Sequence, residues 1–258
     1  MQLSTGQIGL WTASLLGQLY LVYLIARNRI WEDLPVFSWY FIINLFNGLL
    51  IAATYIYWGT QATQSWSTFW ALEGVTIFLR TMVSVEIWRK TLKPYPGIWA
   101  LAWRLLAAVG MLGLLVAYVQ VYKQHPTFRN FMFSAKPHLE FASAITLIVF
   151  LLFCRYYTVS LEPALKAITI GICFYSALQG LNATIVNHWS SVYVPVWRYM
   201  IVLSFGCTMV IWWRGLRVPL PATERPVLYP PEFYPKYSLQ VNEKLRRLNE
   251  QLEGFLKP

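Results

Sequence analysis

The sequence predicts an all-α fold, a seven-transmembrane helix bundle with its N-terminus out and its C-terminus in, followed by a short cytoplasmic amphipathic C-terminal helix. Three observations predict it. Of the 258 residues, 57% are apolar and 12% are charged, whereas a soluble domain carries about 25% charged residues. Aromatic residues, among them 13 Trp, make up 17% of the chain and are typical of membrane interfaces. Seven apolar runs are long enough to cross a bilayer, which takes about 20 residues.

The seven runs cover residues 7–26, 36–58, 67–88, 97–121, 138–155, 164–187 and 193–213. Hydrocarbon offers no hydrogen-bond partners to the backbone, so each crossing segment has to be a helix. The first run lacks the basic start and the small-residue cleavage site of a signal peptide, and we expect it to stay as a helix. Prolines are expected at or near helix starts, where a missing N–H costs little. These prolines are Pro35, Pro94, Pro96, Pro137, Pro163 and Pro195.

Basic residues give the orientation. The first, third and fifth connections between the runs, with the flank after the last run, carry nine basic residues. They are Arg27, Arg29, Arg89, Lys90, Lys93, Arg155, Lys166, Arg214 and Arg217. The other set carries Lys123, Arg129, Lys136 and Arg198. Cytoplasmic loops are enriched in Lys and Arg, so the first set is expected inside. The protein is therefore expected to be integral to a plasma membrane, the bacterial inner membrane, with the lipid bilayer as its first partner.

The chain divides into three parts. Residues 1–217 form the predicted transmembrane domain, residues 218–237 a proline-rich linker, and residues 238–258 an amphipathic helix with an apolar heptad seam. The seam consists of Val241, Leu245, Leu248, Leu252 and Phe255. Because so short a helix is marginal in water, we expect it to bind a partner. That partner is a second copy, another protein, or the cytoplasmic face of the chain's own bundle.

Ionisable residues inside the third run are the first candidates for function, because charge inside a membrane is costly. Glu73, Thr76, Arg80 and Ser84 fall on one helical face, which we expect to point into the bundle. Arg80 has three possible roles: it pairs with Glu73 or Glu140 through a polar cavity, it reaches toward the cytoplasmic face, or it binds an anionic ligand. Glu86 is expected to form an ordinary interfacial ion pair with Arg89 and Lys90.

A second polar group lies in the outer halves of the last three runs. Together with the third run it predicts an outward-facing ligand pocket. The candidate ligand-binding residues are Glu73, Arg80, Glu140, Asn182, His188 and Arg198. The alternative is that these side chains only hydrogen-bond between helices, at about 0.6 kcal/mol per bond. A metal site of His138, Glu140, His188 and Glu73 has acceptable ligand types, but no spacing motif supports it.

Several function classes are disfavoured. The three cysteines, Cys154, Cys173 and Cys207, lie scattered in apolar runs, which argues against a disulfide framework or a zinc site. The seventh run has no lysine for a retinal Schiff base. No nucleotide-binding or serine-nucleophile motif appears. We therefore expect no catalytic residue, no cofactor and no nucleic-acid partner; the net charge of +10 is assigned to topology and anionic lipid.

Short motifs give one resemblance. Residues 86–97, which read EIWRKTLKPYPG, are followed by His138-Leu139-Glu140 and by KAITIG at 166–171. Over residues 1–217 the chain resembles a group of uncharacterised seven-helix bacterial integral membrane proteins. The resemblance implies the bundle and brings no established activity.

The sequence leaves three functional hypotheses. The leading one is a receptor-like or scaffold-like membrane protein with an outer polar pocket and a partner-binding cytoplasmic helix. The second is a non-catalytic subunit of a larger membrane protein complex, whose many Trp and Tyr side chains pack against neighbours. The third is a transporter of a small anionic solute, which depends on Glu73 and Arg80.

Overall fold

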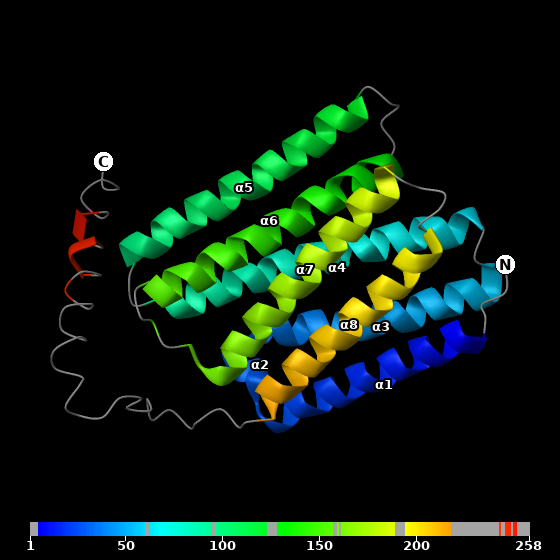
Figure 1. Ribbon diagram of the computed structural model, residues 1–258, viewed down its shortest axis with the longest axis horizontal. Helices are drawn as coiled ribbons and strands as arrows, with labels where there is room; N and C mark the ends of the chain where they lie inside the picture. The colour runs from blue at the N-terminus through cyan, green and yellow to red at the C-terminus, as the bar shows by residue number, and fades with distance from the viewer. Residues whose placement is uncertain are drawn as a thin grey trace.

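The structure is a computed structural model, and it describes residues 5–59, 62–93, 96–122, 128–156, 159, 161–188, 194–217, 243, 246–248, 250 and 251. Within these residues the chain is helical, without strands. The helices are α1 (Thr5–Arg27), α2 (Ile30–Asp33), α3 (Pro35–Trp58), α4 (Thr63–Leu92), α5 (Pro96–Tyr122), α6 (Phe128–Tyr156), α7 (Pro163–His188) and α8 (Val194–Leu216). All except α2 are long, and they run alternately up and down (Figure 1).

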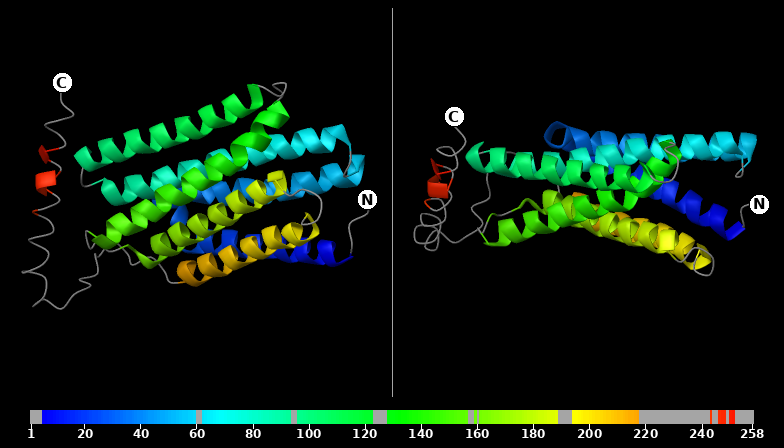
Figure 2. Two further views of the ribbon diagram at one scale, coloured as in Figure 1. Left: turned by 45° about the horizontal axis from the view of Figure 1, so that its top comes forward. Right: turned by 90° about the horizontal axis from the view of Figure 1, so that it is seen from above.

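Six of the long helices form a closed ring in the order α1, α3, α4, α6, α7, α8. Helix α4 also contacts α7 across the ring, and α5 packs outside it against α4 and α6. The α3–α4 pair and the α7–α8 pair diverge toward the end of the bundle at which α1 begins (Figure 2, right). We call this end the N-terminal end of the bundle. The other end, at which α1 and α8 finish, is called the opposite end.

Helices α1, α3, α4, α5, α6 and α7 are long and apolar enough to cross a membrane by length and composition. In α8 the stretch assessed is shorter, Val202–Leu216, and it is also apolar. The basic residues expected inside, from Arg27 to Arg217, lie near the opposite end of the bundle, because they follow α1, α4, α6 and α8 or begin α7.

Prolines begin three of the helices, as predicted: Pro35, Pro96 and Pro163 are the first residues of α3, α5 and α7. The prediction for Pro137 is wrong, because Pro137 lies inside α6, which begins ten residues before the predicted run. The run predicted from 138 covers only part of the apolar helix, whose membrane-capable stretch begins at Asn130. The turns before residue 138 carry Lys136, whose charge is neutralised inside the bundle, so the helix continues through them.

The apolar core is concentrated toward the opposite end of the bundle. Its centre is Trp212, which is fully buried and packs edge-on against Phe37 and Phe41, with ring centroids 6.0 Å and 5.0 Å apart. The indole Nε1 of Trp212 donates to the carbonyl oxygen of Ile168 at 3.3 Å. A much smaller cluster of buried residues, Trp70, Ile77 and Met132, lies between α4 and α6 nearer the N-terminal end. The N-terminal half of the ring therefore has less apolar packing at its centre.

Glu86 caps the start of α3, which corrects its predicted ion pair with Arg89 and Lys90. Its two carboxylate oxygens accept the backbone N–H groups of Val36 and Phe37 at 2.8 Å and 2.9 Å. These donors have no partner within their own helix, and a negative charge is favourable at a helix N-terminus. Lys90 instead lies 3.5 Å from carboxylate oxygens of both Asp33 and Glu162.

The C-terminal segment is described in part. Arg246 pairs with Glu250 at 3.2 Å, and Arg247 with Glu243 at 2.7 Å, both at helical spacing. Leu248 packs against the main apolar core of the bundle and is partly buried. The other four residues of the predicted seam, Val241, Leu245, Leu252 and Phe255, lie outside the described residues.

Candidate functional site

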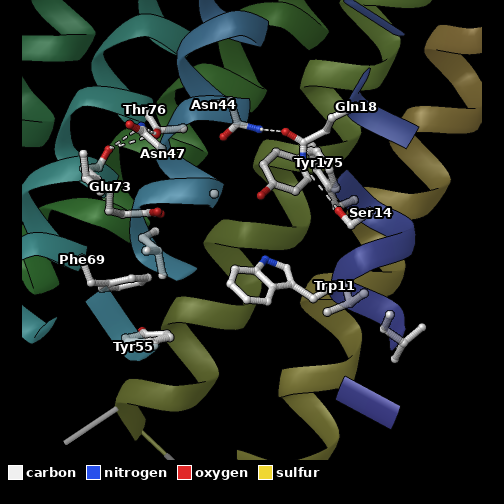
Figure 3. Close-up of a pocket in the computed structure, with 16 residues that line it drawn as sticks. Trp11, Ser14, Gln18, Asn44, Asn47, Tyr55, Phe69, Glu73, Thr76 and Tyr175 are labelled. Carbon is white, nitrogen blue, oxygen red and sulfur yellow. Dashed lines mark hydrogen bonds between the residues drawn. The ribbon is translucent and has the colours of Figure 1, made fainter. Parts of the chain in front are cut away.

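A cavity of about 420 Å³ lies inside the ring, in its N-terminal half (Figure 3). Five helices line it. The lining residues are Leu10, Trp11, Ser14 and Gln18 of α1, Asn44, Asn47, Gly48, Ile51 and Tyr55 of α3, Phe69, Leu72, Glu73 and Thr76 of α4, Tyr175 of α7, and Val202 and Phe205 of α8. This volume is in the range of small-molecule sites, which combine apolar walls with a few polar groups.

Amides and hydroxyls make one polar band across the cavity. Asn44 Nδ2 donates to Gln18 Oε1 at 3.3 Å, which links α3 to α1. Gln18 Nε2 donates in turn to Ser14 Oγ at 3.5 Å. Asn47 Nδ2 donates to Thr76 Oγ1 at 3.0 Å and links α3 to α4 (Figure 3). Three of the five helices around the cavity, α1, α3 and α4, are thus linked by polar contacts.

Glu73 is the charged residue that lines the cavity. Its carboxylate points from α4 toward the space between α4 and α7 (Figure 3). Lys136 of α6 neutralises it, with Nζ 2.6 Å from Glu73 Oε1. Both side chains are mostly buried, with 14% and 20% of the lysine and glutamate side chains exposed. Lys136 does not line the cavity, so the carboxylate faces the cavity and the ammonium lies behind it.

A buried ion pair between Arg80 of α4 and Glu140 of α6 lies next to the cavity, on the side toward the opposite end of the bundle. Both side chains are almost fully buried, 3% and 1% exposed. The guanidinium carbon of Arg80 lies 4.5 Å from the ring centroid of Tyr175 and 5.9 Å from that of Tyr40, within the range of cation–π contact. Because Tyr175 lines the cavity and neither Arg80 nor Glu140 does, the tyrosine separates the ion pair from the cavity.

Several buried polar atoms of the Arg80–Glu140 pair and of α7 have no hydrogen-bond partner among the described residues. They are Arg80 Nε, Glu140 Oε2, Ser176 Oγ, Gln179 Oε1 and Asn182 Oδ1. Ser176, Gln179 and Asn182 follow one another on one face of α7, and all three are buried. Buried polar groups are usually satisfied, so this face of α7 is a polar interior surface distinct from the cavity wall.

The predicted ligand-binding residues separate into three groups. Glu73 lines the cavity. Arg80, Glu140 and Asn182 are buried but do not line the cavity. Arg80 and Glu140 pair with each other, which is one of the possibilities left open for Arg80. His188 ends α7 and Arg198 lies in the first turns of α8, but their side chains lie outside the described part of the structure.

The prediction missed the α1 wall of the cavity. Trp11, Ser14 and Gln18 are spaced by three and four residues, so they share a helical face, and this signal could have been found. It was overlooked because none of the three is charged. Asn44 and Asn47 of α3, which were not among the predicted ligand-binding residues, also line the cavity.

The lining offers hydrogen bonds, one carboxylate and aromatic walls, a set that suits binding. Within the described residues, no group of three or more His, Cys, Asp and Glu side chains comes together as a metal site would require. No family model matches the chain, and neither a curated protein nor a solved structure matches it. The resemblance to seven-helix bacterial membrane proteins therefore stays a prediction.

Proposed function

We propose that this protein is a receptor-like membrane protein that binds a small molecule in the cavity between α1, α3, α4, α7 and α8. In this proposal the chain crosses a bacterial inner membrane seven times, and the N-terminal end of the bundle faces outward. The cytoplasmic C-terminal helix contacts a protein partner. The observation that carries the proposal is a cavity of about 420 Å³ inside the bundle, lined by amides, hydroxyls and a carboxylate together with apolar and aromatic side chains.

The basic residues support the orientation. Nine Lys and Arg residues lie in the last turns of α1, α4, α6 and α8, directly after α1, α4 and α8, or at the start of α7, whereas the sequence has four on the side expected to face outward. The positive-inside rule places the richer end in the cytoplasm. The cavity then lies in the outer half of the bundle, on the side where a receptor meets its ligand.

The ion pair weighs against the anion-transport hypothesis. Transport of an anion needs a cation that the solute can reach. Arg80 is paired with Glu140 and covered by Tyr175, and Lys136 is paired with Glu73. Among the described lining residues, none is a lysine or arginine.

The C-terminal contact supports a cytoplasmic role for the tail. Leu248 packs against the bundle core, which favours the chain's own cytoplasmic face as one docking site for the seam. Removal of residues 238–258 is expected to change the oligomeric state or the proteins that co-purify after crosslinking. If neither changes, the partner-binding part of the proposal fails.

Cysteine accessibility tests the cavity. In a background without Cys154, Cys173 and Cys207, we expect Ser14→Cys to react with a water-soluble methanethiosulfonate reagent added outside intact cells. The matched control is Ser176→Cys, since Ser176 is fully buried, and it should stay unmodified. An unreactive Ser14→Cys in a folded protein would refute an outward-open cavity.

A further inference from the structure

We propose that the cavity ligand is an organic cation, an ammonium group carried on an aromatic or aliphatic body. This inference rests on the proposed function, because it names the class of molecule that the same cavity takes. It is argued from which polar atoms of the wall are still free, from the charge that faces the cavity, and from the rings around it.

The wall offers a ligand two acceptor groups, the amide oxygen of Asn44 and the carboxylate of Glu73, both of which line the cavity. The Nδ2 groups of Asn44 and Asn47 and the Nε2 group of Gln18 each already donate within the wall. Among the described residues, no hydrogen bond is donated to Asn44 Oδ1, and the contact of Lys136 Nζ with Glu73 is to Oε1 of the carboxylate. A carboxylate accepts several hydrogen bonds. A ligand head that donates N–H groups therefore complements this wall.

The charge near the cavity also favours a cation. Glu73 lines the cavity and its partner Lys136 does not, so a ligand meets the negative end of this pair first. Hydrogen bonds between an ammonium and a carboxylate are about twice as strong as neutral ones. An anion would approach the carboxylate with no free cation among the described lining residues to offset the repulsion.

Aromatic side chains surround the position of the head group. Trp11, Phe69 and Tyr175 come from three different helices and extend into the same space (Figure 3). Aromatic faces attract cations, Trp most strongly, and they also bury the apolar body of a ligand. Tyr175 already contacts the cationic Arg80, so this ring is positioned between one cation of the protein and the cavity.

A matched series of small molecules tests the class. We would titrate the purified full-length protein with phenethylamine, 2-phenylethanol and 3-phenylpropionate by isothermal calorimetry at neutral pH. The amine is protonated there, and the three differ mainly in the charge of the head group. We expect the amine to bind about tenfold more tightly than the alcohol, and the carboxylate not to bind. Equal or tighter binding of the carboxylate, or no binding of the amine, would overturn the proposal.

Variants assign the effect to Glu73. Glu73→Gln is expected to lower the amine affinity to that of the alcohol. The control is Glu162→Gln, since Glu162 is also a carboxylate near a lysine, 3.5 Å from Lys90, but lies at the opposite end of the bundle. An unchanged amine affinity in a folded Glu73→Gln protein contradicts the proposal.

A labelling measurement covers the case in which Glu73→Gln does not fold. Ser14→Cys should react faster with a methanethiosulfonate that carries a trimethylammonium group than with one that carries a sulfonate group. For each reagent, the rate at Ser14→Cys is divided by its rate at the exposed position Gly6→Cys. If Ser14→Cys reacts without this preference, the cation proposal fails and the accessible cavity stands. If it does not react at all, the proposed function itself fails.

Discussion

Arg80 and Glu140 form the most deeply buried of the described ion pairs, so both charges are removed from water. Moving an ion into a low-dielectric interior is expensive, and its partner compensates only while both are present. Tyr40 and Tyr175 add cation–π contacts to Arg80. The pair is therefore expected to hold α4 against α6 and to support Tyr175, which separates it from the cavity.

Arg80→Ala is expected to destabilise the protein by about 3–5 kcal/mol, because it leaves Glu140 buried without a counter-charge. Thermal unfolding in detergent, followed by tryptophan fluorescence, measures this. The double variant Arg80→Met with Glu140→Leu should recover much of the loss, since it removes both charges. Arg246→Ala, which breaks an exposed pair with Glu250, serves as the control and should change little. A single variant as stable as the wild type would refute the structural role of the pair.

Individual charges were predictable from sequence where they lay inside an apolar run. A charge inside an apolar run needs a partner, and the pairing of Arg80 with Glu140 was among the possibilities. The Lys136–Glu73 pair was not predicted, because Lys136 was assigned to the connection before the run that starts at 138. Glu86 was assigned to its sequence neighbours, whereas its partners are two backbone N–H groups fifty residues away. Such a contact becomes visible only once α3 and α4 are placed side by side.

At the scale of single elements, α7 and α8 approach each other closely where both carry small residues. A Cβ at Gly215 would overlap that of Ala167, and a Cβ at Gly171 would overlap the ring of Trp212. Small residues at such crossings let backbones approach, which is a main source of stability between membrane helices.

Gly215→Ala is expected to separate α7 from α8 and to lower the unfolding temperature clearly. Gly206→Ala on the same helix is the matched control, because a Cβ there meets nothing within 4 Å. Alanine favours helix by about 1 kcal/mol over glycine, so Gly206→Ala should be neutral or stabilising. Equal effects of the two substitutions would show that the close contact does not matter.

The cap on α3 gives a local prediction. Glu86→Ala removes both acceptors of the Val36 and Phe37 N–H groups. Hydrogen exchange at these two amides should become faster, while exchange in the middle of α3 stays unchanged. Unaltered exchange at Val36 and Phe37 would mean that the cap does not hold in solution.

The sequence predicts the existence of the long helices better than their ends. All seven runs correspond to a helix, because length and apolar content decide that a segment is helical in lipid. The additional turns at the starts of α4 and α6 mix polar with apolar residues, and in α6 they make tertiary contacts such as that of Lys136 with Glu73. The short α2 was not predicted either, since four residues, Ile30–Asp33, carry too little pattern.

At the scale of the whole molecule, apolar packing and polar space are separated along the bundle axis. The main core, centred on Trp212, fills the end that we place in the cytoplasm, and the cavity occupies the other half. The composition of the sequence predicted a polar outer region but not its walls, because the cavity depends on how α1, α3 and α8 close the ring. The α1–α8 contact that completes the ring joins the first and last of these helices, and sequence periodicity cannot predict such a pairing.

The most direct test of the account is the sidedness of the bundle. Single cysteines at Gly6→Cys and Arg217→Cys, in a background without the three native cysteines, would be treated with a membrane-impermeant maleimide before and after the membrane is opened. We predict that Gly6→Cys is labelled on intact cells and that Arg217→Cys is labelled only after opening. Labelling of both positions from the same side would contradict an odd number of crossings, and with it the outward-facing cavity.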